Sequence, residues 1–305
     1  MISVHTLGTG SGKPTPERNV SCTAVFRQGD VILFDCGEGT QMQITRSQLR
    51  PGDIKLICIT HFHGDHINGL PGLLGTLQLN QRTEPLTVIG PKGIRSYLSA
   101  LSKLGVLGIG YKLVVTEVSE PGVVLDMGEY TIAADRLKHR VPCWGYRLSE
   151  PDRPGRFNVD QARDLGVPPG PLYGRLQRGE DVTLPDGRII ASNDVVGEPR
   201  RGLSVAYCLD TEPCDGAVRL AAGVDLLIHE GTYAPGEERV AHDRGHSSMI
   251  DAAETAVQAG AQRLVVTHVS SKYPRVNGFL KDVRKVMAEA DIASDLDVFE
   301  LGYVD

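Results

Sequence analysis

The sequence predicts an α/β protein, and two observations lead to this prediction. Short β-rich runs alternate with amphipathic helical patterns along almost the whole chain. The 305 residues, of which 41% are hydrophobic and 23% charged, have a globular composition and suffice for one large domain. Because alternating strands and helices form layered structures, we expect helices that cover the faces of central sheets.

Individual elements follow from the local pattern of the chain. Apolar runs bounded by Gly, Pro or Asp predict strands at residues 1–7, 22–27, 30–35, 54–60, 86–90, 111–118, 130–137, 203–210, 224–231, 262–269 and 296–301. Helical spacing of apolar residues predicts helices at residues 38–49, 67–79, 92–104, 247–260 and 279–290.

One segment interrupts this alternation. The stretch from Pro151 to Gly202 is rich in Pro and Gly and holds only fragments of helix or strand pattern. A long irregular stretch inside a compact domain is usually a functional excursion or a disordered linker. Since ordered motifs resume on either side, we predict one domain over residues 1–305 with a flexible arm inserted at 152–201.

Composition also limits the setting in which the chain works. No apolar stretch is long enough to span a bilayer, and the first residues lack the pattern of a secretory signal. The six cysteines show neither CxxC pairing nor the density of a disulfide scaffold, so we expect a cytoplasmic protein without a membrane partner. The net charge of −6 argues against a general nucleic-acid coat but permits a local basic groove.

Three histidines and an aspartate crowd the stretch HFHGDH, as His61, His63, Asp65 and His66. They follow an expected buried strand, at the strand end where ligands gather in α/β sheets. Imidazole and carboxylate are the ligands that Zn²⁺ prefers outside thiolate sites. Four donors on one tight loop cannot all reach a single ion without strain, so we predict two divalent ions.

Three more polar residues each close an apolar strand: His139, Asp210 and His268. Taken singly, each would be interpreted as a surface or capping residue. Their shared position at strand ends, together with HFHGDH, predicts that they lie on the same rim and bind the metals. Two divalent ions lower the pKa of a shared water molecule from 15.7 towards about 7. We assign Asp65 to orient that water and accept its proton, as in a hydrolase.

This pattern, HxHxDH followed by separate His, Asp and His, resembles the metallo-β-lactamase superfamily. The resemblance implies a four-layer αββα sandwich and two Zn²⁺ ions per subunit, for which Mn²⁺ is an alternative that N/O donors also accept. The ligands that it implies are divided between the ions: His61, His63 and His139 for one, Asp65, His66 and His268 for the other, with Asp210 bridging both.

Four further stretches narrow the choice of substrate class: GTGSGKPTPERNVS (8–21), FDCGEGTQMQI (34–44), GVPPGPLYGRL (166–176) and RGHSS (244–248). Together with HEGT (229–232) and THVSSKY (267–273), they are similar to the ribonuclease Z family in its short bacterial form. The resemblance implies a zinc-dependent endoribonuclease, working as a homodimer on tRNA precursors. It implies cleavage after the discriminator nucleotide, which leaves a 3′-hydroxyl on the tRNA and a 5′-phosphate on the trailer.

The resemblance also suggests a catalytic acid. His246 precedes a near capping box, from Ser248 to Asp251, that opens an amphipathic helix whose N-terminus suits a phosphate. By resemblance, His246 is expected to protonate the departing ribose 3′-oxygen, and Ser247 and Ser248 to contact the substrate. The residues expected to support the metal ligands or His246 from behind are Asp35, His229 and Glu230.

Basic residues are candidates for RNA contacts. Lys13 and Arg18 lie on a Gly/Pro-rich loop with no evident packing role, and we expect them to hold the acceptor end. In the family, the arm is an exosite for tRNA, and Arg175 and Arg178 follow its expected tip. Residues 150–202 nevertheless hold eight arginines and nine acidic residues, a net charge of −1. Any grip on RNA must therefore come from locally placed arginines and backbone N–H groups.

Two other functions fit the same sequence. One is a small-molecule phosphodiesterase or lactonase with the same metals, which predicts that deletion of 152–201 leaves turnover of its native substrate intact. The other is a metal-stabilised RNA-binding protein without catalysis, in which replacement of Asp65 by Ala would remove no cleavage. The ribonuclease interpretation predicts that tRNA cleavage is lost in both cases.

Overall fold

The computed structural model describes residues 1–303. Met1–Ser149 and Leu203–Gly302 form one compact unit, and residues 150–202 together with Tyr303 form a second. The larger unit contains two seven-stranded sheets. In order across the first sheet, the strands are β18 (Val298–Leu301), β1 (Ile2–Gly8), β3 (Cys22–Arg27), β4 (Asp30–Phe34), β5 (Ile54–Cys58), β6 (Leu86–Pro91) and β7 (Leu113–Val118).

The second sheet has a similar plan. In order, its strands are β17 (Ala290–Ile292), β15 (Leu264–Thr267), β14 (Leu226–Glu230), β13 (Ser204–Cys208), β10 (Cys143–Ser149), β9 (Thr131–Leu137) and β8 (Gly122–Asp126). Strands β4 to β7 run parallel to one another, as do β13, β14, β15 and β17. Within each parallel set the carboxyl ends lie at one edge, so the loops that follow these strands gather there.

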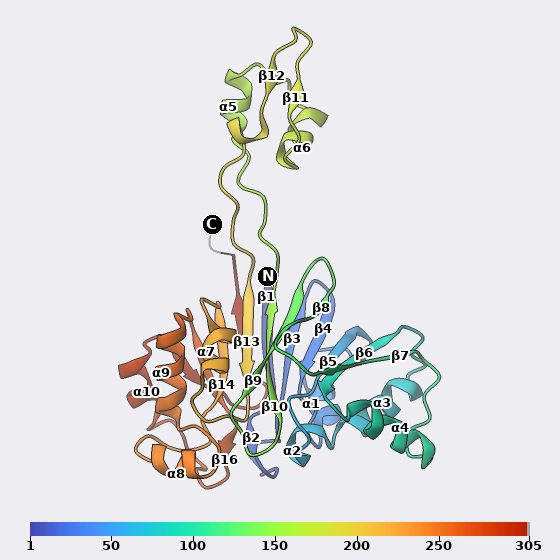
Figure 1. Ribbon diagram of the computed structural model, residues 1–305, viewed down its shortest axis with the longest axis vertical. Coiled ribbons are helices and arrows are strands. Elements are labelled where there is room, and N and C mark those ends of the chain that lie inside the picture. The colour runs from blue at the N-terminus through green and yellow to red at the C-terminus, as the bar shows by residue number, and fades with distance from the viewer. Residues whose placement is uncertain (304–305) are drawn as a thin grey trace. The chain divides into compact units, whose positions relative to one another are not determined.

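Helices cover the outer face of each sheet (Figure 1). The first sheet carries α1 (Thr40–Arg46), α3 (Leu70–Leu79) and α4 (Ile94–Lys103). The second carries α7 (Asp215–Ala221), α9 (Met249–Ala259) and α10 (Leu280–Val286). The architecture is therefore the four-layer αββα sandwich that the resemblance implies.

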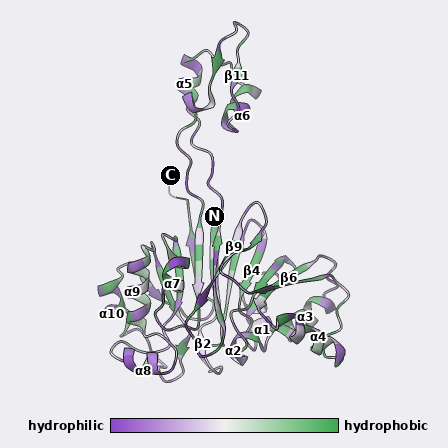
Figure 2. Ribbon diagram, in the orientation of Figure 1, coloured by the Kyte–Doolittle hydropathy of each residue, from purple (hydrophilic) through white to green (hydrophobic). Residues whose placement is uncertain are grey.

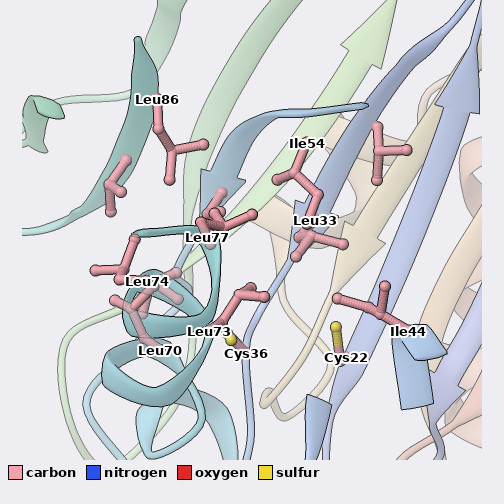
Figure 3. Close-up of a cluster of buried hydrophobic side chains, with 14 of the residues drawn as sticks. Cys22, Leu33, Cys36, Ile44, Ile54, Leu70, Leu73, Leu74, Leu77 and Leu86 are labelled. Atoms are coloured by element: carbon pink, nitrogen blue, oxygen red, sulfur yellow. The ribbon is translucent and has the colours of Figure 1, made fainter. Parts of the chain in front are cut away.

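Helix α3 illustrates how the outer helices pack against the sheets. Its buried leucines, at positions 70, 73, 74 and 77, follow the i, i+3, i+4, i+7 spacing of one helical face. They point toward Leu33 and Ile54 of the sheet (Figure 3). Each of these leucines is at most 1% exposed, and burial of such a side chain contributes about 1.5–3 kcal/mol.

The inner faces of the two sheets pack against each other. Phe34 of the first sheet stacks on Tyr207 of the second, with ring centroids 5.3 Å apart, and lies 6.2 Å from Tyr146. The Tyr146 hydroxyl donates to the Ile59 carbonyl at 2.7 Å. Hydrophobic colouring concentrates on the strands and hydrophilic colouring on the helices, as expected for sheets buried on both faces (Figure 2).

Shorter elements lie in the loops of the larger unit: α2 (Gly64–Ile67), α8 (Glu238–Asp243), and the two-residue strands β2 (Gly10–Ser11) and β16 (Val269–Ser270), which pair in parallel. No helix within residues 1–303 combines the length and apolar character needed to cross a membrane.

The smaller unit is more ordered than its sequence suggests. It contains α5 (Val159–Asp164), α6 (Pro171–Gln177) and a hairpin of β11 (Val182–Thr183) and β12 (Ile189–Ile190). Its own apolar cluster consists of Ala162, Val167, Leu176, Val182, Leu184, Ile190 and Val195. These apolar residues are spaced too irregularly along the chain to produce a helical or strand period, which is why the sequence indicated an irregular stretch.

All eleven expected strands and all five expected helices are present, most of them with shorter bounds. The sequence analysis missed β8, β10 and β17 and the short helices α2, α7 and α8. Strand β10 is the most consequential omission, since it lies between β13 and β9. Its sequence, CWGYRLS, lacks period-2 alternation because nearly every position is buried.

Candidate metal centre

The predicted ligands come from loops at the carboxyl ends of strands in both sheets. The loop after β5 carries His61 and His63, and α2 carries Asp65 and His66. The loops after β9, β13 and β15 supply the others: His139, Asp210 and His268. The structure brings all seven side chains together at one place in the larger unit.

Asp210 lies at the middle of this cluster and is 2% exposed. Four imidazole Nε2 atoms lie near its carboxylate oxygens, at 3.8 Å for His61, 3.5 Å for His66, 4.0 Å for His139 and 3.1 Å for His268. His63 instead turns Nδ1 inward, 2.9 Å from the Nε2 of His61. Asp210 therefore presents one carboxylate oxygen to His268 and the other to His61, His66 and His139.

Asp65 completes the second half of the centre. Its Oδ2 lies 3.5 Å from the Nε2 of His66 and 3.4 Å from that of His268. The donor atoms form three overlapping groups, each within 4.8 Å: His61, His63, His139 and Asp210; Asp65, His66 and His268; and Asp210, Glu230, His246 and His268. The first two groups correspond to the ligands that the resemblance implies for the two ions, and the third adds Glu230 and His246 at the edge of the centre.

The outward nitrogen of four histidines is occupied by a fixed partner. The Nδ1 atoms contact Thr60 Oγ1 for His61 (2.9 Å), Asp35 Oδ2 for His66 (2.7 Å), the Gly245 carbonyl for His139 (2.7 Å) and Thr232 Oγ1 for His268 (2.8 Å). The Thr60 hydroxyl donates to Asp35 and the Thr232 hydroxyl to Glu230, so each accepts from its imidazole. Every one of these Nδ1 atoms therefore donates to its partner, which leaves Nε2 as the nitrogen that faces the centre.

The donor set fits divalent cations. His66 Nε2, His268 Nε2 and Asp210 Oδ1 are buried and have no hydrogen-bond partner among residues 1–303. Two acceptor atoms 3.1 Å apart, as in His268 and Asp210, repel each other unless a proton or a metal cation lies between them. Ligand atoms around tetrahedral zinc lie about 3.3 Å apart, close to the distances found here.

Protonation of these groups follows the same logic. Burial, aided by the His66 charge, lowers the pKa of His61 to about 2, so this ring is neutral. Burial alone would raise the pKa of Asp210, but the charges of His268 and His66 hold it well below its usual value. His61 and Asp210 are therefore in the forms that bind a metal. Burial opposes the charge of His66, but Asp210 and Asp35 outweigh burial and raise the pKa of His66 well above its usual value, so this ring must lose a proton when a metal binds.

Two residues of the centre have left-handed backbone conformations. Asp35, directly after β4, has φ of 60°, and the metal-ligand candidate His268 has φ of 58°. Such conformations cost about 1–3 kcal/mol in residues other than glycine and persist where the surroundings enforce them. At Asp35 the surroundings include the Thr60 N–H, which donates to the carboxylate at 2.8 Å.

His246 and Glu230 form a pair at the edge of the centre. The His246 Nδ1 donates to Glu230 Oε1 at 3.0 Å, and Glu230 is fully buried. Glu230 also accepts from the N–H groups of Thr211 (2.6 Å) and Ser247 (3.0 Å). Burial of the His246 ring opposes its charge, but Glu230 and the more distant Asp210 outweigh this effect and raise the pKa of His246 to about 9.

The loop that carries Lys13 and Arg18 differs in part from expectation. Its Gly12 N–H donates to Asp65 Oδ2 at 2.7 Å, so the loop reaches the centre, and Lys13 is exposed. Arg18, by contrast, does have a packing role. Its Nη1 donates to the Thr9 hydroxyl and the Ala293 carbonyl, both at 2.6 Å. The guanidinium of Arg18 therefore holds the base of the loop.

Ser247 and Ser248 are also placed differently from the expectation that they contact substrate. Both are fully buried. The Ser247 hydroxyl donates to the Thr211 carbonyl at 2.6 Å, while Ser248 caps α9 by accepting from the Asp251 N–H at 3.1 Å. The capping box predicted from the sequence is present. Both hydroxyls thus serve the fold rather than a ligand.

Replacement of Ser248 by Ala tests this structural role. The loss of an N-cap costs about 1 kcal/mol, which lowers the Tm of a chain of this size by roughly 1–2 °C. We expect this drop in thermal unfolding together with an unchanged KM for a tRNA precursor. An unchanged Tm with a tenfold higher KM would instead indicate that Ser248 contacts the substrate.

His229 does not meet the centre through its side chain. It is fully buried, and its Nδ1 donates to the Glu230 carbonyl at 2.8 Å. Neighbouring residues of a strand point to opposite faces, so His229 faces away from the side on which Glu230 meets His246. Its Nε2 has no hydrogen-bond partner within the described residues.

The arm's two candidate arginines are partly neutralised within their own unit. Arg175 Nε lies 2.9 Å from Glu180 Oε2, and Arg178 Nε lies 3.2 Å from Glu180 Oε1. All three side chains are about half exposed or more. A ligand phosphate can therefore compete with Glu180 for both guanidinium groups, at the cost of that pairing.

Sequence analysis missed three supporting hydroxyls: Thr60, Thr232 and Tyr207. Two of them had a usable signal, since Thr60 directly precedes His61 and Thr232 ends the stretch HEGT. Tyr207 had none, because it reaches Asp35 from the other sheet, 172 residues away in the sequence.

The αββα fold and this His/Asp centre define a protein of the metallo-β-lactamase type. Residues 15–176 match the family described as Metallo-beta-lactamase superfamily, and residues 171–269 match the Beta-lactamase superfamily domain. The crystal structure of human tRNase Z, short form, superposes with a TM-score of 0.73 at 28% identity, covering 98% of this chain and 99% of that one.

Curated relatives narrow the assignment. Ribonuclease Z of a Cyanothece species is 45% identical, in an alignment that covers 98% of this chain and 96% of that protein. Ribonuclease Z of Limosilactobacillus fermentum is 42% identical, with 99% of both proteins covered. The chain belongs to the ribonuclease Z family.

Proposed function

We propose that this chain is a metal-dependent endoribonuclease that removes the 3′ trailer from tRNA precursors. Hydrolysis after the discriminator nucleotide would leave a 3′-hydroxyl on the tRNA and a 5′-phosphate on the trailer. One observation carries the proposal: in a chain of the ribonuclease Z family, His246 is held through Nδ1 by Glu230 beside a seven-ligand His/Asp centre. A hydrolytic centre and a proton donor for the leaving group thus lie side by side.

We propose two Zn²⁺ ions per subunit as the cofactors, with Mn²⁺ as the alternative for N/O donors. The residues that would hold them are His61, His63 and His139 for one ion, Asp65, His66 and His268 for the other, and Asp210 for both. When bound, such ions act as Lewis acids toward the phosphodiester and lower the pKa of water.

Asp65 is the residue assigned to the attacking water. Its Oδ2 accepts from the Gly12 N–H at 2.7 Å, which fixes the orientation of the carboxylate. Burial works against ionisation of Asp65, but the adjacent His268 and His66 rings, whose Nε2 atoms lie 3.4 and 3.5 Å from its Oδ2, hold its pKa far below the usual value. An ionised carboxylate accepts a hydrogen bond from water, orients it toward phosphorus and takes its proton as the new P–O bond forms.

His246 is the residue assigned to the leaving group. Its Nδ1 proton is held by Glu230, so its Nε2 is the nitrogen that can transfer a proton. As the bond between phosphorus and the discriminator 3′-oxygen breaks, the Nε2 proton passes to that oxygen. A pKa near 9 keeps the ring protonated at neutral pH, as a general acid requires.

Two parts of the proposal rest on the resemblance to ribonuclease Z. The chain is proposed to work in the cytoplasm as a homodimer, in which each arm serves the active site of the other subunit. Light scattering after size-exclusion chromatography would report the mass in solution. A monomer that still cleaves tRNA precursors efficiently would contradict the dimer.

The direct test of function is incubation of a 3′-extended tRNA with metal-loaded protein. We expect a single cut after the discriminator nucleotide, with a 3′-hydroxyl on one product and a 5′-phosphate on the other. Primer extension and end-group analysis would locate the cut. Degradation without a preferred position would contradict the proposed specificity, and binding without cleavage would favour a non-catalytic RNA-binding protein.

Removal of the arm separates recognition from chemistry. Replacement of residues 152–201 by a short Gly/Ser linker should lower kcat/KM for tRNA precursor by about 100-fold or more, because binding energy from remote contacts is lost. Turnover of bis(p-nitrophenyl) phosphate should change less than about twofold, since the metal centre lies wholly in the larger unit.

The same deletion discriminates the alternative function. A small-molecule phosphodiesterase would keep full activity on its native substrate, and any tRNA cleavage would be equally weak with or without the arm. Circular dichroism and metal content of the deletion variant would show that the larger unit has folded.

A further inference from the structure

We propose that Tyr207 is a positioning residue that keeps the two halves of the metal centre in register. The inference rests on the metal-binding part of the proposed function. One half of the centre, from His61 to His66, follows strand β5 of the first sheet. The other half includes Asp210, which follows β13 of the second sheet. Both ions need ligands from both halves, so the alignment of the two sheets decides the geometry of the centre.

Asp35 is where the two halves meet. Its carboxylate is fully buried and accepts from the Thr60 N–H (2.8 Å), the Thr60 hydroxyl (2.9 Å), His66 Nδ1 (2.7 Å) and the Tyr207 hydroxyl (3.0 Å). Thr60 and His66 belong to the loop of the first sheet. Tyr207 is the donor that comes from the second sheet, on the strand that leads to Asp210 three residues later.

The Tyr207 ring is itself fixed. It is fully buried and stacks on Phe34, with ring centroids 5.3 Å apart. Burial, reinforced by the Asp35 charge, raises the pKa of the Tyr207 phenol well above its usual value, so the hydroxyl stays protonated and donates. A rigid donor on β13 thus holds the carboxylate that orients His66, whose Nε2 lies 3.5 Å from Asp210.

Three other contacts cross between the sheets near this point. Tyr146 donates from its hydroxyl to the Ile59 carbonyl at 2.7 Å, and Trp144 donates from its N–H to the Thr60 carbonyl at 3.1 Å; both end on backbone carbonyls. In the third, Cys143 Sγ lies 3.8 Å from His61 Nδ1, a long contact of a thiol that donates to the Leu209 carbonyl at 3.2 Å. The Tyr207 bond is the short one that ends on a side chain in contact with a metal-ligand candidate.

Tyr146 therefore provides a matched control. Like Tyr207, it is fully buried, comes from the second sheet and donates its hydroxyl to the first. Tyr207→Phe and Tyr146→Phe each delete one buried hydroxyl without changing the shape of the ring. We expect both variants to lower the Tm of the metal-free full-length protein by a similar few degrees.

The two variants should differ in metal affinity. Loss of an outer partner of a metal ligand weakens metal binding by roughly 10–100-fold. We expect Tyr207→Phe to weaken the affinity for Zn²⁺ about tenfold, measured by competition with a chromophoric chelator, and Tyr146→Phe to weaken it less than about twofold. Equal Zn²⁺ affinities of the two variants would overturn the inference.

A double-mutant cycle tests whether Tyr207 acts through Asp35. If it does, Tyr207→Phe should have almost no further effect on Zn²⁺ affinity in an Asp35→Asn background. Additive effects would show that Tyr207 acts on general stability and would overturn the inference. Because the readout is Zn²⁺ affinity, a protein that fails to cleave tRNA precursors would refute the proposed function and leave this result standing.

Discussion

Replacement of Asp210 by Asn is expected to lower the rate of tRNA precursor cleavage by at least about 10³-fold, equivalent to about 4 kcal/mol of transition-state stabilisation. The physical reason is the central position of this carboxylate. Four Nε2 atoms lie within 4.0 Å of its oxygens, and Asp210 is the residue assigned to both ions. An amide of the same size removes the negative charge and places N–H donors against imidazole lone pairs.

The same substitution should also reduce the bound metal. We expect purified Asp210→Asn protein to retain at most one metal ion per chain by inductively coupled plasma mass spectrometry. The metal-free variant should remain folded, because the neutral amide is cheaper to bury than a carboxylate. Loss of activity in a folded protein with less metal would link the effect to the centre rather than to unfolding.

Glu212 offers a control for the loss of one negative charge. It lies two residues further along the same loop and pairs with Lys138, with Nζ and Oε2 2.7 Å apart. Glu212→Gln should leave metal content unchanged and alter cleavage by less than about threefold, since a surface ion pair contributes little. If Asp210→Asn kept two metal ions and a tenth of the activity, the bridging role would be wrong.

The clustering of the seven candidate ligands could be predicted from sequence because strand ends carry positional information. Asp210 and His268 each follow an apolar run, and the right-handed α/β topology brings the carboxyl ends of parallel strands to one edge. The short spacing in HFHGDH needs no tertiary information at all. These features depend on local pattern, which a single sequence contains.

The supporting contacts depend on tertiary packing and could not be predicted in the same way. Arg18 was assigned to RNA because its loop shows no apolar period, yet its guanidinium meets Thr9 and the Ala293 carbonyl. Ser248 was assigned to substrate because a helix N-terminus suits a phosphate, yet the hydroxyl caps its own helix. In both cases the segment reaches the centre, through the Gly12 N–H to Asp65 and the Ser247 N–H to Glu230, and only the fold decides which group each side chain meets.

Replacement of His246 by Ala is the second prediction with a large effect. Removal of a general acid costs about 10²–10⁴-fold in rate, so we expect kcat for tRNA precursor to fall within this range with little change in KM. Metal content should stay at the wild-type level if the seven assigned residues hold the ions, whereas a loss of metal would make His246 a ligand, as part of the group with Asp210, Glu230 and His268. This pattern would distinguish His246→Ala from Asp210→Asn.

His242 supplies a matched histidine control. It lies on α8, is about 40% exposed and contacts Asp251 at 3.0 Å rather than Glu230. His242→Ala should change kcat by less than about threefold. Equal losses in the two alanine variants would show that the region, rather than the proton on His246, is required.

The pH profile gives a second test of the same residue. A general acid must be protonated, so the rate should fall as pH rises through its pKa, which lies near 9 without metal. Two bound divalent cations repel an imidazolium, so the alkaline limb of the loaded enzyme should appear at or below pH 9. This limb should be absent in His246→Ala.

Two substrates with different leaving groups can distinguish proton donation by His246 from charge stabilisation at phosphorus. The ribose 3′-oxygen is strongly basic and needs a proton as it departs, whereas p-nitrophenolate departs without one. His246→Ala should therefore lose about 10²-fold or more on tRNA precursor and less than about fivefold on bis(p-nitrophenyl) phosphate. Equal losses of rate on both substrates would contradict proton donation by His246. They would indicate that His246 stabilises charge at phosphorus, because that role is needed whichever oxygen departs.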